Sequence, residues 1–516
     1  MKSVKWLIAV GLIAVTVATV QAGSMPEVTH QQVMNVLPEL SNLAQQTLEK
    51  TGVPGMAIIV VYKDQMVYLK GFGVRKVGTE DPIDPDTVFQ LASLSKPITS
   101  TVLAGLVGDG VIDWDDPVVD HWPDFRLYDP WVTRQVTLRD LLCHRSGLPA
   151  QVGDLLEDMG YGRMEILRRL RYVKPATSFR SHFAYTNFGF TAAAIAAARA
   201  SGKRWEDLVA DNLYHPLGMR SSSSRFRDFE SASNRAFLHV RIDGTWVPKY
   251  VRDPDAQSPA GGVSSTARDL AQWIRLQLNG GTFEGKRIIA AEPLSETHRP
   301  QIVTKFDPKT NRATFYGLGW NVGHDDNDRV FWTHSGAFYL GMRTEVALLP
   351  AEGIGIAVLS NAGPTGVPEG ITKSFFDLLF YGKFQRDWVT LANRMFEEAV
   401  KTSFGYNTNY LLPPSHPSPG LASAAYVGIY HNDYFGDIDI VGKDGALVLN
   451  MGLRQASIPL RHWSRDVFIY QPVGESAGGL SGVTFRIDPE GKATEVVVEN
   501  LDIFGQGAFV RAPIIK

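Results

Sequence analysis

Strand-like apolar runs at both ends of the first 400 residues, with helical patterns between them, place the strongest constraint on the fold of this chain. Near the N-terminus, residues 57–62 and 66–73 flank Lys63-Asp64-Gln65, a pattern typical of a β-hairpin. Further strand-like runs follow late in this region, at residues 316–322, 330–332, 342–349 and 354–360. We therefore predict an α/β (α+β) fold, in which an antiparallel sheet is closed by both ends, flanked by helices and interrupted by a helical subdomain.

The segments between the strands carry helix signals. Residues 27–50 are expected to form a helix with Ser41 as a capping residue, and residues 138–142 a helix capped near Thr137. An alanine-rich helix is expected at residues 188–200. Other helical patterns cover residues 93–107, 267–276 and 372–379. These helices would flank the sheet and build the inserted subdomain.

The texture of the sequence changes after residue 400. A proline-rich stretch at 401–420, which includes Pro413-Pro414, predicts a linker. Eight short alternating runs follow it, at residues 426–430, 437–441, 446–450, 457–460, 467–471, 483–487, 495–499 and 507–510. Residues 421–516 are therefore expected to form a small all-β barrel or sandwich. Because 516 residues are too many for one compact domain, we assign residues 23–400 to the first domain.

The N-terminus has the layout of a secretory signal peptide. Lys2 and Lys5 precede an apolar run at residues 6–20, and small residues lead to Ala22. The run is shorter than the roughly 20 residues that a membrane-spanning helix needs, so cleavage of residues 1–22 is favoured over an uncleaved anchor. We expect the mature protein to be periplasmic or secreted, without stable insertion in a membrane.

Charge and cysteine content exclude several classes of function. The formal net charge of −3 gives no electrostatic footprint for nucleic acid. The single cysteine, Cys143, cannot form an internal disulfide and lies in an apolar run, which is typical of a buried hydrophobic residue. The histidines have no metal-ligand spacing, so we expect no metal and no other cofactor. The oligomeric state stays open.

The stretch Phe89–Pro97 holds the first candidate catalytic pair. Ser93 and Lys96 are three residues apart at the expected start of a helix, so they share one face. A lysine whose pKa is lowered can take the proton of a serine nucleophile. The helix N-terminus also offers backbone N–H groups to an anionic transition state. Taken alone, the same spacing occurs in ordinary capped helices.

Tyr185-Thr186-Asn187 is the second candidate motif. A tyrosine that is held as phenolate beside a lysine ammonium can act as base and acid for a serine. The Asn187 amide can bind a substrate carbonyl while it fixes the lysine. The alternative is a structural role, in which Tyr185 packs on the helical subdomain and Asn187 caps the next helix.

His334-Ser335-Gly336 is the third candidate motif. Gly336 would let a substrate backbone approach closely, and the N–H group of Ala337 could pair with that of Ser93 as an oxyanion hole. His334 could bind a substrate carboxylate or tune the lysine. The alternative is a histidine on a strand whose hydrogen bonds are satisfied within the protein.

In this order, the three motifs give the chain a resemblance to the serine β-lactamase-like hydrolases, which include class C β-lactamases, DD-peptidases, D-amino-acid-releasing peptidases and esterases. The resemblance covers residues 28–385, and the stretches 137–149 and 259–269 match as well. It implies a β-lactamase/transpeptidase-like fold and an acyl-enzyme formed on Ser93.

The resemblance also implies a role for each motif residue. Lys96 and Tyr185 would move the proton of the nucleophile to the leaving group and later activate water. The N–H groups of Ser93 and Ala337 would hold the oxyanion. The side chains that would position the substrate are Asn187, His334 and Ser335, with Gly336 beside them.

The third motif departs from class C β-lactamases, which usually carry Lys-Thr-Gly where this chain has His334-Ser335-Gly336. His-Ser-Gly looks like the peptidase and esterase members, so we expect a peptidase for short or linearised peptides, with D-residues among the candidates. The alternatives are a carboxylesterase or weak β-lactamase at the same site, and a non-catalytic relative that binds a ligand. The C-terminal region resembles the lipocalin-like domain of some such peptidases, which can restrict access to the active site.

Gly474-Glu475-Ser476-Ala477-Gly478 matches a second nucleophile pattern, Gly-x-Ser-x-Gly. That elbow requires a strand before it and a helix after it, whereas residues 479–482 read as loop. We therefore expect a glycine-rich turn in which Ser476 is not catalytic.

Overall fold

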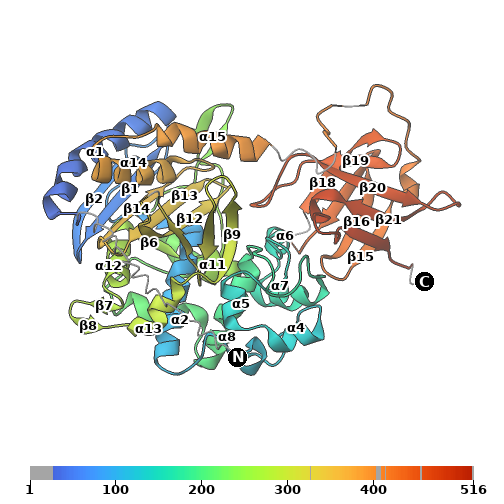
Figure 1. The fold of residues 1–516 in the computed structure, drawn as a ribbon. Helices are drawn as coiled ribbons and strands as arrows, with labels where there is room; N and C mark the ends of the chain where they lie inside the picture. The colour runs from blue at the N-terminus through green and yellow to red at the C-terminus, as the bar shows by residue number, and fades with distance from the viewer. Residues whose placement is uncertain (1–26, 326, 402–407, 413, 454–455, 514–516) are drawn as a thin grey trace, which may run out of the picture.

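The computed structural model describes residues 27–325, 327–401, 408–412, 414–453 and 456–513, which form an α/β body followed by a β-barrel (Figure 1). The predicted signal peptide, residues 1–22, lies outside the described residues. So do residues 402–407 and 413 of the predicted linker. In the part of the chain that is described, no helix is both long and apolar enough to cross a membrane.

An eight-stranded antiparallel sheet forms the centre of the α/β body, with the strand order β2-β1-β14-β13-β12-β11-β10-β9. The strands are β1 Gly55–Tyr62, β2 Gln65–Gly73, β9 Ile302–Asp307, β10 Arg312–Tyr316, β11 Asn321–His324, β12 Val330–Phe338, β13 Met342–Leu349 and β14 Ile354–Ser360. β1 pairs with β14, with Met56 opposite Ser360. The predicted closure of one sheet by both ends of the domain is confirmed.

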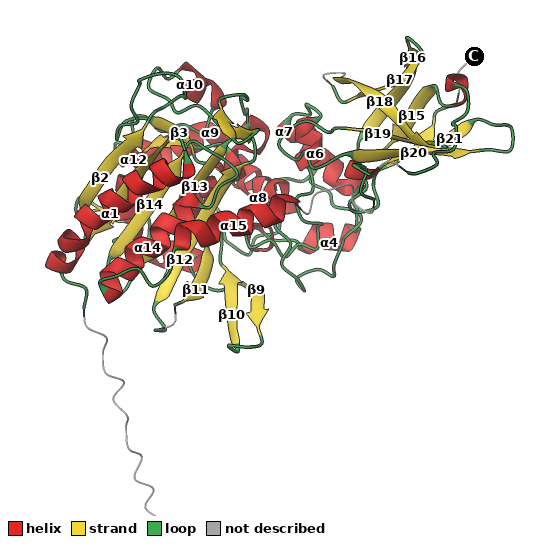
Figure 2. Cartoon of the chain, turned by 90° about the horizontal axis from the view of Figure 1, so that it is seen from above, coloured by secondary structure: helices red, strands yellow, loops and turns green. Residues whose placement is uncertain are grey.

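Helices cover both faces of this sheet, so every residue of β1 is buried. Ile58 and Val60 face α1 (His30–Thr51) and α14 (Val367–Tyr381), with α15 (Trp388–Lys401) beside α14 (Figure 2). The alternate residues of β1 face the other core, whose helices include α2 (Ser95–Gly108) and α12 (Ala267–Leu278). This double burial explains why β1 reads as a continuous apolar run.

The inserted helical subdomain lies on the α2 side of the sheet. Its helices are α3 Val118–His121, α4 Pro130–Gln135, α5 Leu138–Leu142, α6 Asp154–Asp158, α7 Arg163–Arg169, α8 Asn187–Ala200, α9 Trp205–Val209 and α10 Phe226–Ser231. Short elements connect it to the sheet, namely β3 Val88–Gln90, β4 Val240–Ile242, β5 Thr245–Val247, α11 Ser258–Gly261, β6 Ser264–Thr266, β7 Thr282–Phe283, β8 Lys286–Arg287 and α13 Ala291–Thr297. The α5 helix is capped by Thr137, as predicted.

Two local predictions in the α/β body are wrong. Thr29, not Ser41, caps α1 through a Thr-x-x-Gln capping box, and Ser41 lies inside the helix with its hydroxyl bonded to Leu37 O. The run 316–322 is not one strand, because β10 ends at Tyr316 and β11 begins at Asn321. The turn between them contains Gly319 at φ +84°, where a Cβ atom would lie 2.4 Å from the Ser100 hydroxyl on α2. Close packing on α2 therefore breaks the strand.

The C-terminal region is a closed barrel of eight antiparallel strands. The strands are β15 Gly428–Asn432, β16 Gly436–Lys443, β17 Ala446–Met451, β18 Ala456–Ser464, β19 Val467–Tyr470, β20 Ser481–Ile487, β21 Ala493–Val498 and β22 Ala508–Arg511. Pairing of β15 with β22 closes it, with Tyr430 opposite Arg511. Each of the eight predicted runs overlaps one strand, so the all-β prediction is confirmed and a barrel, rather than a sandwich, forms.

The barrel docks on the helical subdomain beside α6 and α7 (Figure 1). The Tyr161 hydroxyl donates to Phe435 O at 2.8 Å, and Arg169 donates to Tyr434 O at 2.6 Å. On this side of the molecule, residues 475–480 of the barrel line the same cavity as Ser93 and Tyr185.

Candidate active site

Ser93 lies in a tight 3-10 turn (Ala92–Leu94) between β3 and α2. The preceding residue, Ala92, has φ +47°, a conformation that costs free energy for a residue with a Cβ atom. The turn is held by Ser95, whose hydroxyl donates to Ala92 O at 2.6 Å and accepts from the Val263 N–H at 2.9 Å. The surrounding structure therefore fixes the backbone that presents Ser93.

Lys96 is the second residue of α2, the helix after this turn, and is completely buried. Its Nζ atom donates to Ser93 Oγ at 3.1 Å, Asn187 Oδ1 at 2.7 Å and Ala260 O at 2.9 Å. Burial lowers the pKa of Lys96 to about 7, although the nearby Asp154 carboxylate opposes the shift. A large fraction of Lys96 is thus neutral near pH 7, as a base for the Ser93 proton requires.

Tyr185 and Asn187 come from the start of α8. The ring of Tyr185 lies under Lys96, and its phenol interacts with Ser93. Burial raises the pKa of Tyr185 above its ordinary value, so the phenolate expected from the sequence is disfavoured and the phenol stays protonated near neutral pH. Thr186 occupies the N-cap position and Asn187 is the first helical residue, so the alternative interpretation of Asn187 as the cap is wrong.

His334 and Ser335 lie on β12, but their polar groups bond to protein atoms. His334 is buried, with Nε2 2.9 Å from the Tyr316 hydroxyl and Nδ1 2.7 Å from Ser335 O. Burial lowers the pKa of His334 to about 3, so the ring is neutral. The Ser335 hydroxyl donates to Glu345, whose pKa burial raises to about 8. Neither residue therefore presents a fixed positive charge to a substrate.

Gly336 allows β12 to approach the Ser93 turn. A Cβ atom there would lie 2.1 Å from Leu91 O, 2.3 Å from Thr344 Oγ1 and 3.2 Å from the Ser93 nitrogen. A side chain at this position would push the strand away from Ser93. The close approach brings the adjacent Ala337 backbone and the Ser93 backbone to the same cavity wall.

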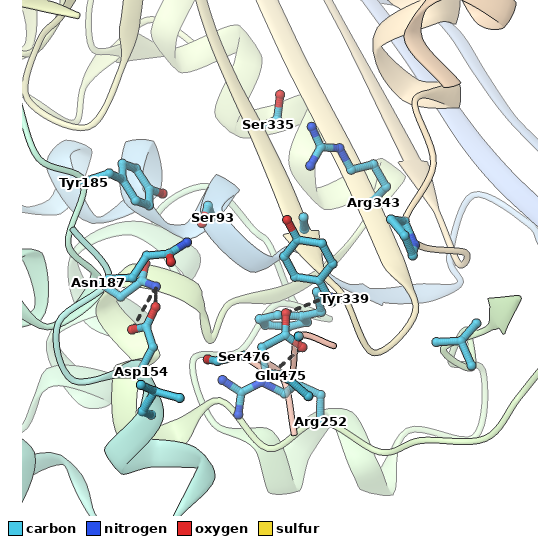
Figure 3. Close-up of a pocket in the computed structure, with 18 of the residues that line it drawn as sticks. Ser93, Asp154, Tyr185, Asn187, Arg252, Ser335, Tyr339, Arg343, Glu475 and Ser476 are labelled. Carbon is cyan, nitrogen blue, oxygen red and sulfur yellow. Dashed lines mark hydrogen bonds and ion pairs between the residues drawn. The ribbon is translucent and has the colours of Figure 1, made fainter. Parts of the chain in front are cut away.

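A cavity of about 1480 Å³ joins these residues (Figure 3). Five of the eight predicted site residues line it, namely Ser93, Tyr185, Asn187, Ser335 and Ala337. The other three, Lys96, His334 and Gly336, are buried behind its wall. The structure therefore brings the three sequence motifs together around Ser93.

The cavity also contains charged residues that no sequence motif identified. Asp154 accepts from Asn187, while Arg252 and Arg343 lie further along the wall (Figure 3). Arg252 pairs with Glu157, and Arg343 pairs with Glu369. No local pattern distinguishes these residues from surface charges, because each depends on contacts between distant segments.

One wall of the cavity comes from the barrel loop, residues 472–480 between β19 and β20. The loop contains the Gly-x-Ser-x-Gly pattern and is followed by a strand, so it is not a nucleophile elbow. The Glu475 carboxylate accepts from the backbone N–H groups of Tyr339 at 2.6 Å and Leu340 at 3.3 Å. Asp158 accepts from the N–H groups of Glu475 at 2.9 Å and Ser476 at 2.8 Å. This loop, which the sequence predicts to be a turn, is thus fixed by hydrogen bonds to the residues after β12 and to α6.

The described residues offer neither a metal site nor a reactive thiolate. Among the described residues, no group of three or more His, Cys, Asp or Glu side chains could hold a metal ion. Cys143 is buried, and burial raises the pKa of its thiol to about 12, so it is not available as a thiolate.

Comparison with known proteins agrees with this arrangement. A family model described as beta-lactamase matches residues 40–373, and a domain of unknown function (DUF3471) matches residues 412–509. Unguisins hydrolase ungD' of Aspergillus campestris is 26% identical over 488 residues, which cover 89% of this chain and 88% of that protein. Penicillin-binding protein 4 of Amycolatopsis lactamdurans is 29% identical over 344 residues, or 64% of this chain and 84% of the relative.

A solved structure has the same fold. The octameric penicillin-binding protein homologue from Pyrococcus abyssi superposes with a TM-score of 0.59 at 20% identity, covering 92% of this chain and all of that one.

Proposed function

Because this chain belongs to the β-lactamase family, we propose that it is a serine peptidase that cleaves short or linearised peptides, including peptides with D-residues. Ser93 attacks the peptide carbonyl, the C–N bond breaks, and the amine fragment leaves while the acyl group stays on Ser93. Water then hydrolyses the acyl-enzyme and releases the carboxylic acid. Both steps pass through a tetrahedral oxyanion, which the N–H groups of Ser93 and Ala337 stabilise.

The lowered pKa of Lys96 and the raised pKa of Tyr185 indicate the path of proton transfer. Neutral Lys96 accepts the Ser93 proton, since its pKa lies near 7 and its Nζ atom is 3.1 Å from Ser93 Oγ. Tyr185 stays a phenol, donates its proton to the leaving amine and is reprotonated from Lys96. The same groups work in reverse to activate water in the second step. Asn187 accepts from Lys96 through its side-chain oxygen and lines the cavity, so it holds the lysine beside the substrate.

The unpaired edge of β12 is the observation that favours a peptide. Pairing of β12 with β11 stops at Thr333, whereas pairing with β13 continues to Phe338. Among the described strands, residues 335–338 therefore have a partner on one side only. An extended peptide can add to such an edge through backbone hydrogen bonds. This edge is next to Ser93, so a peptide bound to it would place a carbonyl at the nucleophile.

The charges around Ser93 favour a peptide over a β-lactam. His334 is neutral and faces Tyr316, and the guanidinium of Arg343 is already bonded to Glu369. A β-lactam carboxylate would thus find no fixed, unpaired cation from these residues at the third motif. Two relatives of this chain are named as a hydrolase and a penicillin-binding protein, which supports an active enzyme over a relative that only binds a ligand.

Hydrolysis of a peptide library with and without D-residues, read by mass spectrometry, tests the proposal. We expect cleavage products with wild type and none with Ser93→Ala. Preference for a chromogenic cephalosporin would favour a β-lactamase, and turnover of esters alone would favour a carboxylesterase. If neither a fluorophosphonate nor a fluorescent penicillin labels Ser93, the site is catalytically idle.

We also propose that the protein is exported to the periplasm or secreted. The support is the charged and apolar pattern of residues 1–22. N-terminal sequencing of the protein from the exported fraction should begin at Gly23, whereas an intact Met1 would argue against cleavage.

A further inference from the structure

Helix α6 (Asp154–Asp158) lies between the barrel and Asn187, and hydrogen bonds join it to both. On the barrel side, the backbone N–H of Gly153 donates to the Tyr434 hydroxyl at 2.9 Å. At the other end of α6, Asp158 accepts the two N–H groups of the barrel loop, and the next residue, Met159, accepts from the Leu453 N–H at 2.9 Å. The barrel therefore contacts the segment before, at the end of and after this short helix.

On the active-site side, Asp154 fixes the orientation of the Asn187 amide. Asn187 Nδ2 donates to both carboxylate oxygens of Asp154, at 3.2 Å and 3.0 Å (Figure 3). With its N–H groups turned to Asp154, the amide presents Oδ1 to Lys96, 2.7 Å away. If the amide rotated by half a turn, its NH₂ group would face the donor hydrogens of Lys96 and this hydrogen bond would be lost.

The position of Asp154 depends in turn on Gly153. Gly153 has φ +98°, and a Cβ atom on it would lie 2.4 Å from the ring of Phe188, the residue after Asn187. The start of α6 and the start of α8 are therefore in direct contact. A shift of the Gly153 backbone would move Asp154 relative to Asn187, because the two residues sit on these two helix starts.

We propose that the C-terminal barrel positions Lys96 through a continuous chain of contacts, from Tyr434 to Gly153, then from Asp154 through Asn187 to Lys96. Asp154 and Tyr434 are positioning residues in this scheme, since they act through Asn187 and touch no reacting atom. The barrel is then part of the catalytic unit as well as a wall of the cavity. This inference rests on the proposed role of Lys96 as the base for Ser93.

A double-mutant cycle tests the link between Asp154 and Asn187. The measured rate is fluorophosphonate labelling of Ser93, one chemical step that stays measurable in slow variants. We expect Asp154→Ala to slow labelling about tenfold to a hundredfold in the wild-type background, as misplacement of a catalytic group does. In an Asn187→Ala background the same change should cost less than about twofold, because both act through one path.

The Asp154→Asn variant distinguishes a positioning role of Asp154 from a role that needs its negative charge. An asparagine at this position keeps an oxygen that can accept from Asn187, so it should restore most of the rate that Asp154→Ala loses. If the effects of Asp154→Ala and Asn187→Ala are additive, or if Asp154→Ala raises KM for a chromogenic ester and leaves kcat unchanged, Asp154 binds substrate directly and the proposal is wrong.

A pair of tyrosine variants tests the barrel end of the chain. Tyr434→Phe removes the hydroxyl that accepts from Gly153 and keeps the ring. The matched control is Tyr430→Phe, which removes a buried barrel hydroxyl that donates to Tyr426 O, away from α6. We expect Tyr434→Phe to lower kcat about fivefold, the factor of one lost hydrogen bond, and Tyr430→Phe to leave it unchanged. Equal effects of the two variants would overturn the role of the barrel.

Failure of this inference can be distinguished from failure of the proposed function. If Lys96 is not the base, Lys96→Ala will keep a substantial labelling rate, and the proposed function falls. If Lys96→Ala is inactive while Asp154→Ala and Tyr434→Phe label at the wild-type rate, the proposed function stands and the positioning by the barrel is refuted.

Discussion

The Nζ atom of Lys96 lies over the face of the Tyr185 ring, 4.5 Å from the ring centre. Its hydrogen bonds run to Ser93, Asn187 and the Ala260 carbonyl. The face of the ring therefore stabilises the Lys96 ammonium by a cation–π contact, while the phenol hydroxyl interacts with Ser93. The packing role and the chemical role of Tyr185 belong to different atoms, so they can be tested separately.

Tyr185→Phe should keep the fold but lose most of the turnover. The phenylalanine ring still packs against Lys96, so the melting temperature should stay within a few degrees, whereas kcat should fall about a hundredfold because the proton donor to the leaving group is gone. Thermal unfolding and steady-state kinetics with a chromogenic ester measure the two quantities. An unchanged kcat would leave Lys96 as the sole acid and base.

Catalysis should require Ser93 and not Ser476, although both line the same cavity. Ser93→Ala removes the nucleophile and should reduce kcat about a thousandfold or more. Ser476→Ala keeps the backbone N–H that Asp158 accepts, so kcat should change less than about threefold. Loss of activity in Ser476→Ala with retention in Ser93→Ala would refute the whole assignment of the site.

Activity should rise with pH through about 7, because Lys96 must be neutral to accept a proton and its pKa lies near 7. Below that pH, protonated Lys96 cannot act as a base, so kcat/KM should fall about tenfold per pH unit. Glu475 also has a pKa raised to about 7 by burial, and Glu475→Gln serves as the control. The rising limb should persist in that variant. A pH profile that is flat between 5 and 9 in wild type would contradict the assignment of Lys96.

His334→Lys should shift the specificity toward β-lactams. The neutral histidine offers no charge to a carboxylate, whereas a lysine at this position adds a cation next to the third motif. The ratio of kcat/KM for a chromogenic cephalosporin to kcat/KM for a short D-residue-containing peptide should rise about tenfold. The melting temperature should fall, because the new ammonium replaces a buried neutral ring. A wild-type enzyme that already prefers the cephalosporin would reject the peptidase proposal.

Gly153→Ala should destabilise the α/β body. The new methyl group combines a left-handed backbone conformation with a clash against Phe188, and we expect a loss of about 2–4 kcal/mol in the free energy of unfolding by urea. Gly202→Ala is the matched control, since Gly202 has φ +69° but open space around it, and should cost about 1 kcal/mol. Equal losses would show that the contact with Phe188 contributes nothing.

Patterns that repeat within a few residues allowed much of the fold to be predicted. The alternation of polar and apolar residues predicted all eight strands of the barrel, because successive side chains of a strand point to opposite faces of the sheet. The cap of α1 was missed even though Thr29 and Gln32 form a regular capping box, since a serine deeper in the helix offered a competing signal. β9 and α15 were not predicted, and β10 was misplaced, although β9 pairs with the adjacent β10 and α15 packs on the adjacent α14.

The candidate site was predictable only where its residues form motifs along the chain. Ser93, Tyr185 and His334 stand in short patterns whose order is informative. Asp154 and Arg252 do not, since each acquires its partners from segments more than 30 residues away. The orientation of the His334 ring toward Tyr316 could not be predicted from the sequence either, because the two residues lie on different strands of the sheet.

The pairing of β1 with β14 sets the earliest time at which the central sheet can be completed during synthesis. Tyr62 pairs with Ile354, so nearly 300 residues must be synthesised between them, which takes on the order of 15 to 60 s at ordinary rates of translation. During that interval β1, whose eight residues are all buried in the native sheet, has β2 as its only strand partner among the described strands already made. A nascent chain in this state exposes an apolar strand edge, which is the form most prone to aggregate. We therefore expect the nascent chain to be most prone to aggregation in the interval before Ile354 is synthesised.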